Sequence, residues 1–311
     1  MVVQLQQLRY FVAVAETRHF TQAADQVGVT QPSLSKQIHA LETDLGAELF
    51  TRTRGAIALT PAGEALLPLA RRIIADADTA RVEVQELVGL RRGRLRLGAT
   101  PSLCVSLVAP ILRRYADAYP RVRLQVEESG SQDLVRHLVQ GALDMAIIVL
   151  PDAGTDPSLR TEPILRESLV VVSSLTMPPP TEKPPLRITE LRDQPLVMFR
   201  TGYDLRDATV AACERAGFTP SFAVEGGELD AVLGFVEAGL GVALVPSMAV
   251  AGRDRLRITT LAKPGVQRTV ALAHRRDVTP THAARALRDT LLAYLTEASA
   301  WSTLPPGVDP L

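Results

Sequence analysis

Helical segments punctuated by glycine near the start of the chain constrain its fold more than any other sequence feature. Apolar residues recur every three to five positions from Leu5 to Phe20, as one face of a helix requires. We expect Thr21 to cap a second, short helix that ends at Gly28. A third helix then starts with Pro32 in its first turn, where the missing N–H is not needed. A short helix joined to a third helix by a tight glycine turn predicts a helix-turn-helix.

A hairpin and one long helix are predicted after this motif. Two short strand-forming runs flank a turn, the wing, that carries Arg52, Thr53 and Arg54. Apolar residues with helical spacing then continue over 60–90, which corresponds to roughly 45 Å of helix. Their stripe consists of Leu66, Leu69, Ile73, Ala77, Ala80, Val84, Leu87 and Val88. Because this stripe is too long for a small domain to cover, we expect 61–90 to be an exposed dimerisation helix that links two domains.

Strand and helix patterns alternate beyond residue 91. Strands are expected at 95–98, 122–127, 145–150, 169–173, 196–199, 222–224, 242–245 and 269–274, with helices between most of them. This alternation predicts parallel α/β wiring over 91–300. The proline-rich stretch 177–185 is expected to be a surface loop, and 301–311, which holds three prolines, a flexible tail.

Composition excludes several classes of protein. The formal net charge is zero, which argues against a protein that coats nucleic acid indiscriminately. No run of about 18 apolar residues suggests a membrane span, and the first residues do not resemble a secretory signal, so we expect a cytoplasmic protein without membrane association. The two cysteines, Cys104 and Cys213, lack metal-type spacing and do not suggest a disulfide scaffold.

The third helix presents a polar face suited to reading DNA. The recognition helix of a helix-turn-helix enters the major groove with its N-terminal end. Glutamine can read adenine, and lysine can read guanine or hold a phosphate. Charge before residue 60 is balanced, so affinity must come from the placement of a few cations. The predicted DNA-binding residues are Thr21, Gln31, Pro32, Ser33, Ser35, Lys36 and His39, with Arg52, Thr53 and Arg54 of the wing.

The sequence that carries these features resembles the LysR-type transcriptional regulators. The residues that carry the resemblance are 8–16, 20–24, 30–38, 41–42, 45–46, 49–52 and 59–63, and in outline 240–246. The resemblance implies a linker helix that pairs two chains, a homotetramer, and an effector domain with two lobes like periplasmic binding proteins. Lobe I would comprise about 91–163 and 269–297, and lobe II about 164–268. Family members usually carry arginine where this chain has Lys36, which keeps the charge but loses the bidentate fork.

An effector site is expected where helices begin after parallel strands, because free N–H groups there attract anions. The candidates are Thr100, Ser102 and Ser131 from lobe I, and Arg200, Thr201 and Tyr203 from lobe II. They match positions where similar regulators contact their ligands. Taken singly, Ser102 and Ser131 are read as helix caps. Taken together, the six predict a small-molecule effector between the lobes, and we expect an anionic metabolite with Arg200 as its cation.

Two other functions remain as alternatives. One is a thiol-based redox regulator of the same family, although its cysteine pair would lie close together and only Cys213 lies near the relevant turn. The other is a two-lobed solute-binding protein without regulatory role, which the first sixty residues disfavour. No catalytic motif indicates an enzyme, and no cofactor or metal is expected. The expected partners are a palindromic promoter DNA, a small effector, further copies of the chain, and RNA polymerase as a candidate.

Overall fold

The computed structural model describes residues 3–53, 56–85, 93–151, 154–301 and 303–311. The chain divides into two compact units. The first comprises Met1–Arg91 and Val139–Ala142, and the second comprises Arg92–Leu138 and Leu143–Leu311. Within the described ranges, no helix combines the length and the apolar character needed to span a bilayer.

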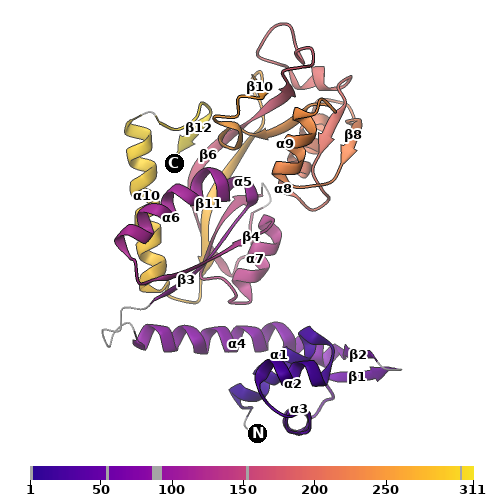
Figure 1. The fold of residues 1–311 in the computed structure, drawn as a ribbon, viewed down its shortest axis with the longest axis vertical. Helices are drawn as coiled ribbons and strands as arrows, with labels where there is room; N and C mark the ends of the chain where they lie inside the picture. Colours follow the sequence, from indigo (N-terminus) through magenta and orange to yellow (C-terminus); the bar gives the residue numbers. More distant parts are fainter. Residues whose placement is uncertain (1–2, 54–55, 86–92, 152–153, 302) are drawn as a thin grey trace. The chain divides into compact units, whose positions relative to one another are not determined.

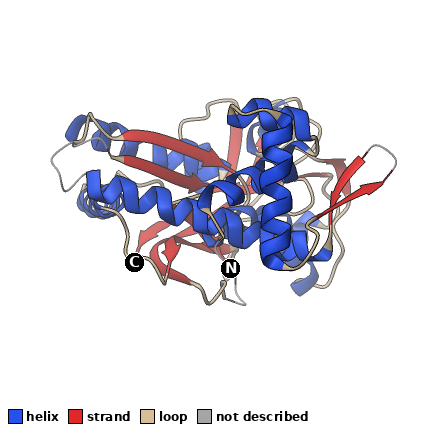
Figure 2. Ribbon diagram, turned by 90° about the horizontal axis from the view of Figure 1, so that it is seen from below, coloured by secondary structure: helices blue, strands red, loops and turns tan. Residues whose placement is uncertain are grey.

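The first unit contains the predicted helix-turn-helix and hairpin (Figure 1). Its elements are α1 (Leu5–Thr17), α2 (Phe20–Val27), α3 (Gln31–Leu45), β1 (Phe50–Thr53), β2 (Ala56–Leu59) and α4 (Pro61–Gln85). Phe11, Leu34 and Leu41 are fully buried where the three short helices meet. Gly28 and Gly46 end α2 and α3 in the left-handed conformation that favours glycine. Strands β1 and β2 pair antiparallel as a hairpin (Figure 2).

The start of α2 differs from the sequence prediction. We expected Thr21 as its cap, but the helix begins at Phe20 and its cap is His19. The His19 ring nitrogen Nδ1 accepts a hydrogen bond from the backbone N–H of Gln22 at 3.4 Å. Arg18 adopts a φ of 53° at the end of α1, so the chain reverses early and Thr21 is an exposed residue of the first helical turn.

Helix α4 is long and only partly covered. Its 25 described residues correspond to about 38 Å of helix. Arg9 and Glu16 of α1 bind Asp78 and Arg71 of α4, with N–O distances of 2.7 and 3.0 Å. The apolar side chains that stay exposed are Leu69 at 55%, Ile73 at 48% and Val84 at 60%. The predicted positions Leu87 and Val88 lie outside the described residues.

The second unit is built on a mixed sheet. Its strands are β3 (Arg94–Ala99), β4 (Arg123–Glu128), β5 (Met145–Leu150), β6 (Leu159–Ser174), β7 (Leu196–Met198), β8 (Phe222–Glu225), β9 (Ala243–Pro246), β10 (Leu256–Thr260), β11 (Gln267–Arg275) and β12 (Val308–Pro310). Its helices are α5 (Pro101–Leu103), the π-helical turn η2 (Cys104–Val108), α6 (Ala109–Ala118), α7 (Ser131–Val139), η3 (Ile188–Leu191), α8 (Asp204–Arg215), α9 (Leu229–Glu237), η4 (Ser247–Val250) and α10 (His282–Ala300). Strand β3 pairs parallel with β4 and β5, as predicted, whereas β11 runs antiparallel to both β5 and β6.

Strand β6 joins two separate hydrophobic cores, and these define lobe I and lobe II. Ile164 and Leu165 pack into the core of lobe I, beneath α6 and α10. Leu169 and the valines that follow it pack into the core of lobe II, against α9 and β9. Figure 1 shows β6 and β11 passing from one lobe to the other. The second unit therefore has the two lobes that the resemblance implied.

Two expectations for the second unit are wrong. Residues 301–311 are not a frayed tail, because β12 pairs with β6 and Val308 is only 7% exposed. Strand β6 begins ten residues before the predicted 169, at Leu159, and β10 is an additional strand beside it. Proline obscured both features in the sequence: Pro163 lies inside β6 and Pro310 inside β12, and proline normally argues against a strand.

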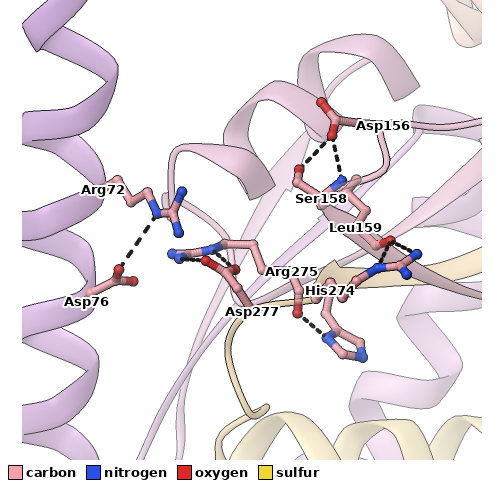
Figure 3. A network of polar contacts seen from close by, with 9 residues as sticks. Arg72, Asp76, Asp156, Ser158, Leu159, His274, Arg275 and Asp277 are labelled. Atoms are coloured by element: carbon pink, nitrogen blue, oxygen red, sulfur yellow. Dashed lines mark hydrogen bonds and ion pairs between the residues drawn. The ribbon is translucent and has the colours of Figure 1, made fainter.

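Polar contacts close the loops that precede β6 and follow β11 (Figure 3). Asp156 accepts hydrogen bonds from the backbone and hydroxyl of Ser158 at 2.8 and 2.6 Å. Arg275 donates to Asp277 at 3.0 Å, and the Nδ1 atom of His274 lies 2.8 Å from the Arg275 carbonyl oxygen. The His274 side chain therefore contacts the backbone of the next residue, Arg275. In the parts of the chain that are described, no three His, Cys, Asp or Glu residues are grouped as metal ligands.

Candidate DNA-binding surface and effector site

The exposed face of α3 carries the residues expected to contact DNA. Leu34, Ile38 and Leu41 point into the core, with at most 2% of their surface exposed. Proline opens the helix within its first two positions, as predicted. Ser35 is half-buried, and the other predicted side chains of this helix are exposed: Gln31, Pro32, Ser33, Lys36 and His39. The structure therefore gathers the α3 candidates on one face, apart from the more sheltered Ser35.

A groove of about 540 Å³ runs between α3 and the start of the hairpin. It is lined by Ser35 and His39 of α3, with Thr51 of β1 on the other side. Glu42 connects the two elements, because its Oε1 atom accepts a bond from the backbone N–H of Leu49 at 2.9 Å. This contact fixes the origin of the wing relative to the recognition helix. The side chains of Arg52 and Thr53, and all of Arg54, lie outside the described residues.

Four of the six predicted effector residues come together between the lobes. Thr100, Ser102 and Ser131 of lobe I and Tyr203 of lobe II are at least 95% buried. Ser131 Oγ donates to Asp204 Oδ2 of lobe II at 2.6 Å and accepts from the Val149 backbone N–H at 3.1 Å. Ser131 therefore bridges the lobes and is not the helix cap that it was read as when taken singly. We call Thr100, Ser102, Ser131, Tyr203, Asp204 and Arg268 the inter-lobe cluster.

Two hydroxyl groups of this cluster are buried without a hydrogen-bond partner among the described residues, Thr100 Oγ1 and Tyr203 Oη. Thr100 occupies the N-cap position of α5, but its side chain makes no capping bond. The Tyr203 ring stacks on Phe199 with centroids 5.1 Å apart, and burial raises the pKa of its hydroxyl. An unsatisfied buried polar group costs about 1–3 kcal/mol. These two atoms therefore retain hydrogen-bonding capacity that no described residue uses.

A buried ion pair that was not predicted lies at the crossing of the lobes. Arg268 of β11 donates through Nε and Nη2 to Glu167 Oε2 of β6, at 2.9 and 2.7 Å. Arg268 Nη2 also donates to Ser102 Oγ at 3.0 Å, so Ser102 too has a role other than helix capping. Glu167 Oε1 accepts from the Met248 backbone N–H at 2.7 Å. The pair thus joins β6, β11, α5 and η4. Sequence alternation could have indicated that Arg268 is buried, because it lies in register with buried Val270 and Leu272, but it does not identify Glu167 as the partner.

Arg200 and Thr201 lie at the edge of this cluster. The Arg200 side chain is 38% exposed, donates to Glu228 at 2.9 Å and lies 5.7 Å from the centre of the Tyr203 ring. Thr201 is exposed, and its carbonyl oxygen accepts from Arg200. Glu228 therefore already balances the charge of Arg200, the cation that the sequence favoured.

Carboxylates were also missed, and they shape the electrostatics of the site. Asp204 follows Tyr203 at the start of α8, and burial raises its pKa although bonds from Ser131 partly offset this effect. Glu128 ends β4 and acts on two neighbours. Burial, together with the charge of Glu128, raises the pKa of the Cys104 thiol to about 12. Burial raises the pKa of the Tyr203 hydroxyl most; the charge of Arg268 opposes this, and the charges of Glu228, Asp204 and Glu128 add to it.

Comparisons with known proteins agree with this architecture. Residues 5–64 match the description "Bacterial regulatory helix-turn-helix protein, lysR family", and residues 89–296 match "LysR substrate binding domain". The uncharacterised regulator YnfL of Escherichia coli is 35% identical over 256 residues, covering 79% of this chain and 83% of its own. A probable hydrogen peroxide-inducible genes activator of Streptomyces viridosporus is 35% identical over 300 residues, 94% of each chain.

Solved structures match over nearly the whole length. A full-length OxyR variant from Pseudomonas aeruginosa has a TM-score of 0.74 and 29% identity, covering 94% of this chain and 95% of its own. The full-length protein CbnR in complex with its target DNA has a TM-score of 0.70 at 23% identity, covering 95% of this chain and all of its own. The second match supports the fold alone.

Proposed function

The chain belongs to the LysR family of bacterial transcriptional regulators, and from this premise we propose that a small molecule bound at the inter-lobe cluster controls its action on promoter DNA. One observation carries the proposal: Thr100 and Tyr203, from opposite lobes, present two buried hydroxyls that have no hydrogen-bond partner among the described residues. A ligand that contacts both lobes binds one relative arrangement of them better than another. It therefore shifts the equilibrium between these arrangements.

Pairing of two chains through α4 is part of the proposal. The exposed side chains of Leu69, Ile73 and Val84 form the apolar stripe expected of a dimerisation helix. A two-fold pair presents two copies of α3, which suits a palindromic site. The family resemblance extends this dimer to a homotetramer.

Removing the two unpartnered hydroxyls tests the site. In the variant Thr100→Val with Tyr203→Phe, we expect binding of the effector to weaken at least tenfold while operator binding persists. Folding should be unaffected or improved by up to about 1 kcal/mol, because neither hydroxyl has a partner to lose in the described part of the chain. The assay is a thermal-shift screen of small metabolites, in which a ligand at a hundred times its Kd adds about 2.7 kcal/mol.

The control is Tyr119→Phe with Thr296→Val, since both residues are exposed and neither belongs to the cluster. A hit that stabilises the wild type and the double variant equally would place the effector elsewhere. A hit that the double variant loses, and the control keeps, supports the inter-lobe site.

Thiol oxidation is the second candidate, favoured by relatives named as hydrogen peroxide-inducible activators. The chemistry of the two thiols argues against it. Cys213 is fully buried in α8, and burial raises its pKa to about 11. Cys104 packs against the lobe I core, and its pKa of about 12 leaves little thiolate at neutral pH. Peroxide therefore has little nucleophile to react with.

We expect the variant Cys104→Ser with Cys213→Ala to regulate its promoter as the wild type does, because neither thiol carries the signal. Anisotropy of labelled promoter DNA, measured before and after peroxide treatment, checks this. Free-thiol titration of the same samples controls for oxidation. A peroxide-dependent change in wild-type DNA affinity that the variant lacks would establish the redox function instead.

A further inference from the structure

The charges around the inter-lobe cluster are unevenly matched. The cation of the cluster, Arg268, already pairs with Glu167, and Arg200 at its edge already pairs with Glu228. Two further carboxylates, Asp204 and Glu128, form no ion pair with any described lysine, arginine or histidine. Asp204 is bonded through Ser131, and Arg268 influences it only as a nearby charge. The site therefore holds a surplus of negative charge.

Both unmatched carboxylates border the unpartnered hydroxyls. The turn that follows Glu128, the last residue of β4, approaches the turn that precedes α8, because a Cβ atom at Gly130 would lie 3.5 Å from the Gly202 carbonyl oxygen. Asp204 is the first residue of α8 and follows Gly202 by two residues. The charges of Asp204 and Glu128 both act on the Tyr203 hydroxyl, which is buried and has no hydrogen-bond partner in the ranges that the structure describes. Thr100, whose hydroxyl is equally buried, follows the end of β3, and β3 pairs with β4 up to Glu128.

Resting on the proposed function of this same site, we propose that the effector carries a protonated amine that binds Asp204 and Glu128, and a hydroxyl or carbonyl group that binds Thr100 and Tyr203. A primary ammonium offers three N–H donors and a positive charge, and neither carboxylate forms an ion pair with a described residue. Free helix N–H groups led us to expect an anion. The surplus carboxylates oppose that expectation, because an anion would enter a region where like charges already outnumber the available cations.

Three probes that share one carbon skeleton separate the possible charges. Serinol carries an amine between two hydroxyls, glycerol is neutral, and glycerate carries a carboxylate. Each is added at millimolar concentration to the full-length protein, and binding is followed by thermal shift and by anisotropy of labelled promoter DNA. We expect serinol to stabilise the wild type, with glycerol and glycerate at least tenfold weaker.

Two isosteric variants locate the amine. Asp204→Asn keeps an oxygen that can accept from Ser131, and Glu128→Gln changes an exposed side chain, so both should fold. Each is expected to weaken serinol binding at least tenfold. The control Asp230→Asn removes an exposed carboxylate of α9 that pairs with Arg253, and it should bind serinol as the wild type does.

The outcomes separate this inference from the proposed function. Three outcomes would overturn the inference that the effector carries an amine. They are binding of glycerate or glycerol that equals or exceeds that of serinol, no binding of serinol, and serinol binding that persists in both Asp204→Asn and Glu128→Gln. A probe of another charge can bind the wild type and lose its binding in Thr100→Val with Tyr203→Phe. That result supports the inter-lobe site and contradicts the inference that the effector carries an amine. If the double variant retains whichever probe binds, the site itself is wrong.

Discussion

Replacing Arg268 with methionine is expected to destabilise the effector-binding domain by about 3–5 kcal/mol, because it leaves Glu167 buried without a countercharge. Glu167 has no exposed surface, and Arg268 is only 7% exposed. The substitution also removes a donor to Ser102 and loosens the carboxylate that holds the Met248 backbone. Chemical denaturation of the full-length protein, followed by circular dichroism and analysed for the transition of this domain, measures the loss.

A matched control distinguishes burial from the mere loss of an ion pair. Arg288→Met breaks a pair with Glu162 in which both side chains are about 40% exposed, so we expect a loss below about 1 kcal/mol. Joint replacement of Arg268 and Glu167 by methionine should recover part of the stability, since no charge then remains buried. A loss for Arg268→Met no larger than that for Arg288→Met would show that burial does not add to the cost of breaking the Arg268–Glu167 pair.

This pair also marks the limit of what the sequence could predict. Arg268 and Glu167 are 101 residues apart and meet only because β6 and β11 are neighbouring antiparallel strands. The predicted β6 started after Glu167, so the sequence did not identify Glu167 as a strand residue that pairs with Arg268. The same long-range pairing places β12 on β6 and turns an expected tail into a strand.

Local features such as helix ends were predicted correctly because they depend on residues that are close in the sequence. Gly28 and Gly46 end helices by adopting a conformation that most residues avoid, and this preference is visible in any sequence. Thr100, Ser131 and Tyr203 were found from one rule, that ligands bind where helices begin after parallel strands, and that arrangement occurs here in both lobes: Thr100 and Ser131 follow β3 and β4, and Tyr203 follows β7 of a separate sheet. The rule located the residues but not their charge environment. Asp204 and Glu128 become informative only once the structure shows which cations are already paired.

Replacing Lys36 with alanine should weaken binding of the proposed dimer to its promoter site by about 2–4 kcal/mol, or roughly 30- to 1,000-fold. Lys36 is exposed on the recognition face of α3, and a two-fold dimer loses it twice. Five basic and five acidic residues precede Thr60, so no general excess of positive charge in that segment compensates for the loss. The measurement is fluorescence anisotropy of a labelled promoter fragment, repeated over a range of salt concentrations.

The salt dependence identifies the kind of contact that Lys36 makes. Each phosphate contact contributes about 0.9 to the slope of log K against log salt. Loss of one contact in each chain should therefore reduce the slope by about 2, whereas a contact to guanine alone weakens the cognate site and leaves the slope nearly unchanged. Lys183→Ala, which removes an exposed lysine from a loop of lobe II, is the matched control and should change neither quantity. Unchanged affinity and slope in Lys36→Ala would contradict docking of α3 in the major groove, because its only lysine would then contact neither base nor phosphate.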